Sequence, residues 1–148
     1  MAAATAAGMK TGIETAFEAY LSQLGATGAV WEKKPAEAGE GEDAWCARQV
    51  AEHIAGANSF FGAGIAGIIG VEGPTPAPIQ LANPTEAIGR TRETFAGLLA
   101  VLDQVKDEQL GMEVEHPRLG KQTVGSLMGI VDYHLKDHAQ QLKTLCGS

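Results

Sequence analysis

The sequence has few cysteines and no cluster of basic residues, and each shortage excludes a class of protein. Its only two cysteines, Cys46 and Cys146, are too few for the disulfide framework of a small secreted domain, so we expect a reducing, cytoplasmic location. Eleven basic against eighteen acidic side chains give a net charge of −7, and the longest basic run is Lys33-Lys34. Because binding to a phosphate backbone needs a basic surface, we expect no nucleic-acid partner.

Long apolar runs are also missing. The most apolar stretch, residues 54–71, is interrupted by Asn58, Ser59 and several glycines, whereas a membrane helix needs about 20 strongly apolar residues. Residues 1–8 are rich in alanine but lack the basic segment and the aliphatic run of a cleaved signal, so we interpret them as a disordered leader. The chain of 148 residues has a common size for one domain, which we place at residues 9–148.

Four segments carry apolar residues at helical spacing, which predicts four amphipathic helices. They are Met9–Leu24, Ala44–Gly70, Pro84–Leu110 and Thr123–Leu145. Asp43 and Asn83 are placed to cap the second and third of these helices, because a side-chain oxygen there accepts hydrogen bonds from free amides.

The connections between these helices are long. They comprise residues 26–43, the proline-containing residues 73–82, and residues 113–120, which we interpret as an extended turn. We therefore predict an all-α fold, a four-helix bundle with long connections, in either antiparallel or crossover topology. The many glycines of the second helix indicate that another helix approaches closely, from the same chain or from a second subunit in a homodimer.

Three of the four histidines lie on apolar helix faces, where an imidazole needs a polar partner. His134 and His138 are four residues apart, so they share one helix face. His53 lies on the apolar face of the second helix, and the three rings can meet whether the two helices run parallel or antiparallel. The alternative is that they are core histidines whose partners are Glu52, Asp137 or backbone carbonyl groups.

Three imidazoles without a fourth protein ligand suit zinc or nickel, or else iron or manganese, with positions left for water or substrate. Asp132, Asp137 and Gln141 are near enough in sequence to orient the rings. Since a ligating imidazole must be neutral, we expect metal affinity to fall below about pH 6.5.

Other residues that could bind a ligand have simpler interpretations. Residues 62–67 match the dinucleotide pattern G-x-G-x-x-G, but they lie in a predicted helix with no strand before it, so we expect no nucleotide site. His116 precedes Pro117 in a turn and is expected to be exposed and outside the site. Trp45, Phe60 and Phe61 are interpreted as core residues.

The order of these motifs resembles the DinB/YfiT-like family of metalloenzymes. The resemblance is carried by Trp45 with His53 eight residues on, by the turn at residues 115–120, and by the final helix reading VDYHLKDHAQQL. It implies a bundle, often dimeric, in which His53, His134 and His138 hold a divalent metal ion. Relatives include transferases and isomerases that use mycothiol or bacillithiol.

We therefore expect a metalloenzyme in which the ion activates a low-molecular-weight thiol, or water, for reaction with a small-molecule substrate. No residue stands out as a general base, and Glu52 and Asp137 are only candidates. The alternative function is a non-catalytic bundle that binds a metal or senses a ligand through the same histidines.

Overall fold

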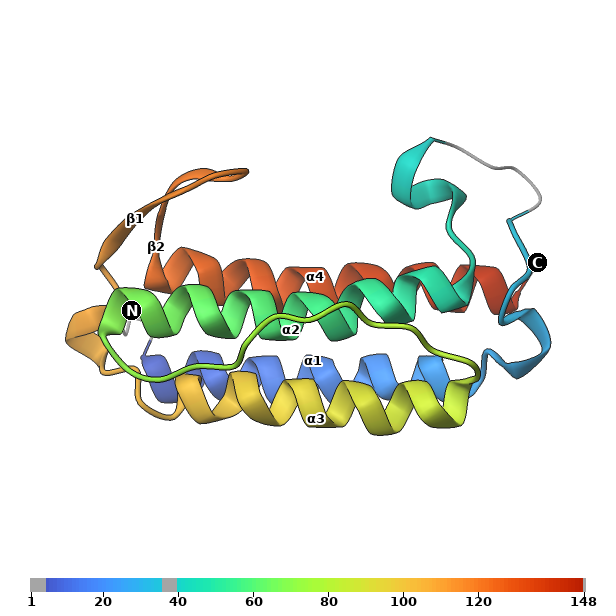
Figure 1. The fold of residues 1–148 in the computed structure, drawn as a ribbon, viewed down its shortest axis with the longest axis horizontal. Helices are drawn as coiled ribbons and strands as arrows, with labels where there is room; N and C mark the ends of the chain where they lie inside the picture. The colour runs from blue at the N-terminus through green and yellow to red at the C-terminus, as the bar shows by residue number, and fades with distance from the viewer. Residues whose placement is uncertain (1–4, 36–39, 148) are drawn as a thin grey trace.

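The computed structural model describes residues 5–35 and 40–147. Its four long helices are α1 (Ala6–Gly25), α2 (Ala47–Ile69), α3 (Pro84–Leu102) and α4 (Val124–Cys146). Short 3-10 turns occur at Gly28–Val30 (η1), Gly41–Ala44 (η2) and Asp107–Gln109 (η3), and a hairpin pairs β1 (Glu113–His116) with β2 (Gly120–Thr123). The predicted all-α, four-helix architecture is confirmed (Figure 1).

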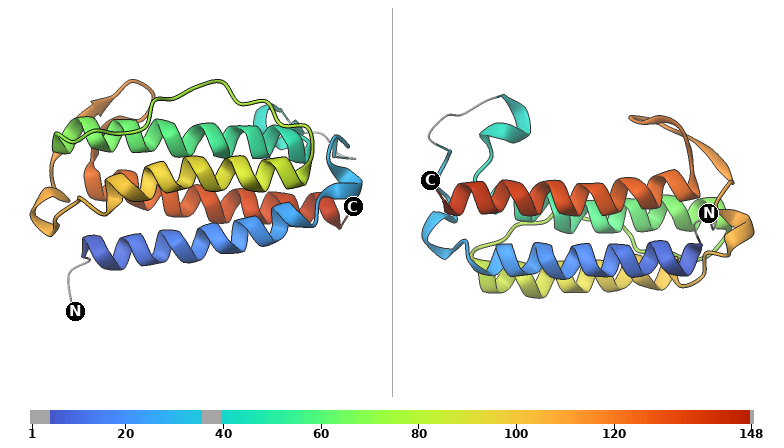
Figure 2. Two further views of the ribbon diagram at one scale, coloured as in Figure 1. Left: turned by 60° about the horizontal axis from the view of Figure 1, so that its bottom comes forward. Right: turned by 180° about the vertical axis from the view of Figure 1, so that it is seen from behind.

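The bundle has a crossover topology, the second of the two arrangements that the sequence allowed. Helices α2 and α3 run in the same direction, and α1 and α4 run together in the opposite direction (Figures 1 and 2). The connection between α2 and α3 therefore returns along the whole length of α2 before α3 begins. As a result, the first half of α2 lies beside the second half of α4, which is where the three histidines occur.

Helix α1 begins earlier than the sequence predicted. The Thr5 side chain accepts a hydrogen bond from the amide of Gly8, and Asp107 Oδ1 accepts one from the amide of Ala6 at 2.8 Å. These two acceptors satisfy free amides of the first turn, so the helix starts at Ala6. The predicted disordered leader is therefore wrong for residues 6–8, while residues 1–4 lie outside the described part of the chain.

Helix α2 begins at Ala47, three residues later than predicted, and Cys46 is its capping residue in place of Asp43. The amide of Cys46 donates to Gln49 Oε1 at 3.0 Å, whereas Asp43 lies in the preceding 3-10 turn. Residues 41–44 form a separate turn before the helix, and the hydrogen bond from Gln141 to the Glu42 carbonyl holds this turn against α4.

The start of α3 is as predicted, since Asn83 Oδ1 accepts from the amide of Glu86 at 2.8 Å. Its end is not: α3 stops at Leu102, eight residues before the predicted Leu110. The apolar spacing continues through Val105, which is buried, but the backbone turns away so that Asp107 can cap α1.

The region after η3 is a two-stranded hairpin where the sequence predicted an extended turn and no strand. His116 pairs with Gly120 next to the turn, and Glu113 pairs with Thr123 at the base. Gly120 has a φ of 74°, a backbone angle that glycine adopts at little cost. The hairpin and η2 rise on the same side of the bundle, above α2 and α4 (Figure 1).

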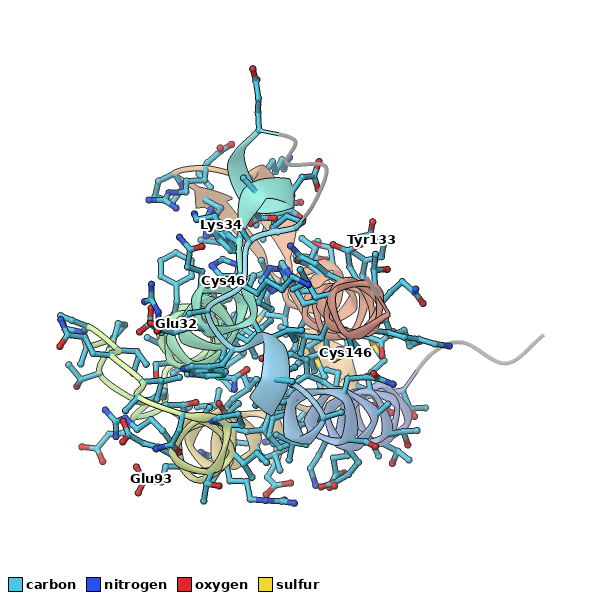
Figure 3. All side chains as sticks on the ribbon, turned by 90° about the vertical axis from the view of Figure 1, so that its right-hand side faces the viewer. Glu32, Lys34, Cys46, Glu93, Tyr133 and Cys146 are labelled. Carbon is cyan, nitrogen blue, oxygen red and sulfur yellow. The ribbon has the colours of Figure 1, made fainter. Side chains whose placement is uncertain are left out.

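The core lies between the four helices and follows the predicted apolar faces. On the apolar face of α1, Ile13, Phe17, Tyr20 and Leu24 are all buried. Phe17 stacks on Phe95 of α3 with ring centroids 3.7 Å apart. Tyr133 lies on the outer side of α4, and the free cysteines Cys46 and Cys146 lie at the same end of the bundle (Figure 3). None of the described helices is both long enough and apolar enough to cross a membrane.

The glycines of α2 admit both the crossover connection and, as the sequence suggested, a neighbouring helix of the same chain, since a Cβ atom on Gly62 would lie 3.4 Å from Leu98 Cα of α3. A Cβ atom on Gly62 would lie 2.8 Å from Pro74 Cγ, and one on Gly73 would lie 2.6 Å from the Ala66 side chain. Gly64 and Gly67 face open space. The close approach is thus made within one chain, and homodimerisation stays a prediction.

Candidate metal centre

The structure brings the three predicted histidines together at one point between α2 and α4. His134 Nε2 lies 2.9 Å from His53 Nε2 and 3.1 Å from His138 Nε2. The carboxylate of Glu42, from η2, approaches the same point, with Oε1 3.7 Å from His53 Nε2 and Oε2 4.0 Å from His138 Nε2. One ligand atom from each of the four residues lies within 4.8 Å of every other, so this group could hold a metal ion.

Gln141 fixes the orientation of His138. Its Oε1 lies 2.7 Å from His138 Nδ1, and because an amide oxygen can only accept, His138 carries its proton on Nδ1. The unprotonated Nε2 of the neutral ring then faces the other histidines. The same amide donates from Nε2 to the backbone carbonyl of Glu42 at 2.7 Å, so Gln141 also holds η2 against α4.

Of the three residues predicted to orient the rings, only Gln141 does so. Asp132 pairs with Lys136 at 2.9 Å, and the exposed Asp137 makes no contact with a histidine ring among the described residues. Glu52 accepts from Arg48 at 2.8 Å and from the amide of Leu81 at 2.9 Å. The alternative in which Glu52 or Asp137 satisfies core histidines is therefore wrong.

Aromatic side chains enclose the group from the sides. The Trp45 ring lies 5.0 Å from that of His53 and 6.4 Å from that of His138, and Phe61 lies 6.4 Å from His134. Trp45 is thus half-buried beside the histidines. Phe60, also predicted as a core residue, is 45% exposed, and that prediction is wrong.

The surroundings keep two of the rings neutral. The pKa of His134 is lowered to about 3, mainly by burial and in addition by the nearby His138 and His53. Burial is also the main cause that lowers the pKa of His53, followed by His138, while the charge of Glu42 acts in the opposite direction. At neutral pH these imidazoles therefore have lone pairs available to a cation.

Hydrogen bonds alone do not account for the two short contacts of His134. His138 Nε2 has no proton, so a proton in its contact with His134 must come from His134 Nε2. One proton cannot lie on both N···N lines, which leaves one contact poorly satisfied. Ligands held at about 2.0–2.1 Å from one ion are separated by about 2.9–3.4 Å, and the observed 2.9 Å and 3.1 Å fit that range.

The group opens onto a groove of about 640 Å³. Its floor includes His53, Gly56 and Phe60 of α2 with Ile130 and His134 of α4. Glu42 and residues 116–119 at the tip of the hairpin also line this groove. A small molecule in this groove would lie against His53 and His134.

Two residues of the site were missed by sequence analysis. Glu42 was assigned to a connection, although it lies in an acidic run shortly before Trp45 and His53, and three ligands were expected instead of four. His116 was expected to be exposed; it is half-buried and lines the groove, though it is not part of the metal group. Residues 62–67 are helical, so the dinucleotide pattern there forms no phosphate-binding turn.

Comparison with protein families matches residues 13–142 to the model of the DinB superfamily. The chain belongs to the DinB superfamily. The match covers both helices that carry the histidines and agrees with the resemblance found in the sequence. Searches of curated proteins and of solved structures find no match.

Proposed function

We propose that this DinB-superfamily protein is a metalloenzyme that binds one divalent ion through His53, His134 and His138, with Glu42 as a fourth ligand. The observation that carries the proposal is the convergence of three Nε2 atoms beside an open groove that His53 and His134 line. A structural metal site is normally closed by its ligands, whereas a catalytic site keeps a position accessible to substrate, which here requires a five-coordinate ion or displacement of the exposed Glu42.

The reaction we propose is attack of a low-molecular-weight thiolate on an electrophilic carbon of a small molecule, so that a C–S bond forms and the bond from that carbon to its leaving group breaks. A divalent ion held by imidazoles lowers the pKa of a thiol or water bound to it, which supplies a nucleophile near neutral pH. The protein residues contribute binding and orientation: Gln141 directs His138, and Trp45 and Phe61 keep bulk water from the rings. The Glu42 carboxylate oxygen that does not bind the ion would accept the proton that the thiol loses, since this side chain is 52% exposed.

Zinc and nickel remain the first choices for the ion, because imidazole nitrogens dominate the group. The added carboxylate oxygen of Glu42 makes iron or manganese more suitable than three histidines alone would. Metal analysis of the untagged protein, purified from cells grown with trace metals, would identify the ion.

The test of catalysis compares three preparations: protein loaded with the metal found by analysis, chelator-treated protein, and the His138→Ala variant. Each is assayed with mycothiol, bacillithiol and glutathione against 1-chloro-2,4-dinitrobenzene, followed by absorbance. We expect a metal-dependent rate with at least one thiol and the uncatalysed rate in the other two preparations. If all three give the uncatalysed rate with every thiol, the non-catalytic metal-binding or ligand-sensing function should replace the enzyme.

A further inference from the structure

The hairpin brings two polar side chains, His116 and Arg118, to the wall of the groove. Both line it together with His53 and His134, and neither belongs to the metal group. They come from the tip of the hairpin, above the floor formed by α2 and α4 (Figure 1). Their role is therefore to be sought in what the groove binds.

Hydrogen bonds fix the ring of His116 and leave one of its nitrogens, a donor, without a partner. Its Nδ1 accepts from the backbone amides of Arg118 and Leu119, both at 3.1 Å. A ring nitrogen that accepts hydrogen bonds carries no proton, so the neutral ring carries its proton on Nε2. This Nε2 is buried and has no hydrogen-bond partner among the described residues. Because a buried unpaired donor is unfavourable, a ligand acceptor beside it would be bound.

Arg118 is likewise without an anionic partner. The other three arginines each form ion pairs: Arg48 with Glu32 and Glu52, Arg90 with Glu93, and Arg92 with Glu18. Arg118 forms none with residues 5–35 or 40–147. A guanidinium group presents a planar fork of N–H donors that matches a carboxylate.

The rest of the groove is apolar. Phe60 and Leu119 both line it and are 45% and 41% exposed, which is unusual for large apolar side chains in this protein. A second cavity of about 380 Å³ adjoins the groove and shares Phe60, Phe61 and His116 with it. A ligand with an apolar body would cover these surfaces.

We propose that His116 and Arg118 bind the carboxylate of the small-molecule substrate, whose apolar body lies on Phe60 and Leu119 and whose other end reaches the metal group. This proposal rests on the proposed function for one point only, that the end of the substrate near the metal group reacts there. It narrows the electrophile to a carboxylic acid, since a neutral or cationic compound would leave both donors unpaired.

Direct binding tests this assignment without any assay of activity. Isothermal titration of zinc-loaded and metal-free protein would compare 4-phenylbutanoate with its neutral match, 4-phenylbutanamide. Since a hydrogen bond to a charged group contributes more than one to a neutral group, we expect the carboxylate to bind roughly tenfold more tightly. The Arg118→Gln variant should lose most of this preference and keep only the part that His116 supplies. Arg92→Gln, which removes an arginine of α3 outside the groove, should keep the wild-type preference.

A second variant tests His116 without removing the turn that it supports. In His116→Asn the amide oxygen can still accept from the amides of Arg118 and Leu119, but the Nε2 donor is lost. We expect the preference for the carboxylate to fall several-fold in this variant.

The proposal is overturned if the wild-type protein binds neither compound or shows no preference for the carboxylate. It is also overturned if the full preference survives in Arg118→Gln, because Arg118 would then not bind the carboxylate. Failure of the metal proposal gives a different pattern. In that case zinc does not bind, yet metal-free protein still prefers the carboxylate in a way that depends on Arg118.

Discussion

Gln141 and His138, three residues apart on α4, are joined by a hydrogen bond of 2.7 Å between Oε1 and Nδ1. This bond determines which nitrogen of His138 faces the other histidines, and the same Gln141 side chain tethers Glu42 through its backbone carbonyl. One neutral side chain therefore positions two of the four candidate ligands.

Gln141→Leu should weaken metal binding by about 10- to 100-fold, since loss of a residue that orients a ligand commonly has an effect of that size. Competition with a chromophoric chelator would measure the affinity. Gln140→Leu is the matched control, because Gln140 is exposed and donates weakly to Thr144 at 3.5 Å. Equal affinities in the two variants would contradict the role given to Gln141.

His134→Ala should abolish tight binding of the ion, because His134 is the ring that contacts both other histidines. The fold should persist, as the apolar faces of the four helices are unchanged, and circular dichroism would show it. His116→Asn is the control, because it changes a histidine outside the metal group. We expect one ion per chain in this variant and in the wild-type protein. Full metal occupancy in His134→Ala would remove His134 from the ligand set.

Glu42→Gln should lower the affinity for the ion less than His134→Ala does. Its oxygens lie 3.7 Å and 4.0 Å from the nearest histidine nitrogens, and its side chain is half-exposed, so we rank it as the weakest of the four ligands. Chelator competition on both variants would rank them. An equal loss of metal affinity in the two variants would show that Glu42 contributes as much to binding as His134 does.

The metal-free protein should lose stability in acid through His134 and His53. Both have folded-state pKa values below the value of about 6.5 expected in the unfolded chain, that of His134 being about 3. Between these values the unfolded chain binds protons that the folded chain does not, so stability is full above about pH 6.5 and declines as the pH falls toward about 3. Urea unfolding at several pH values should show that the free energy of unfolding declines less in His134→Gln than in the wild-type protein. If it falls equally with pH in both proteins, His134 is not a source of the acid sensitivity.

The same shifts alter the expected release of the ion. Protons compete for His134 and His53 only well below their ordinary pKa, so metal affinity should begin to fall at a more acidic pH than the 6.5 or so inferred from the sequence. Titration of bound metal against pH would locate the midpoint. A midpoint at or above pH 6.5 would contradict the low pKa values.

Gly62→Ala should destabilise the protein by about 1–3 kcal/mol, because the new methyl group would overlap Pro74 of the crossover connection. Gly64→Ala, in the same helix but facing open space, should stabilise it by up to about 1 kcal/mol through helix propensity. Urea unfolding would measure both. A neutral Gly62→Ala would show that the connection is free to move aside.

Helical periodicity explains why much of the site was predictable. Residues four apart on α4 must share a face, and the apolar spacing around His53 turns that histidine inward, so the three rings could be selected from the sequence. The cap at Asn83 was predictable for a similar reason, since its partner amide is three residues away. Local geometry determines each of these features.

The features that sequence reasoning missed depend on contacts between distant parts of the chain. Glu42 reaches the histidines because Gln141, ninety-nine residues later, holds its carbonyl. Helix α3 ends early while its apolar spacing continues, and Asp107 beyond it caps α1, which is 101 residues away. Phe60 has the spacing of a core residue, but no described element packs over it closely enough to bury it. Spacing within one segment carries no information about such contacts.

The parallel run of α2 and α3 also limits how the chain length can vary. Residues 70–83 must span a helix of twenty-three residues, or about 33 Å, and the fifteen virtual bonds from Ile69 to Pro84 reach about 47 Å at the rise of a polyproline helix. The margin is therefore about four residues. Larger deletions in this connection would pull the two helices out of register, whereas insertions would only lengthen the loop. Alignments of relatives should accordingly show insertions but no long deletions in this stretch.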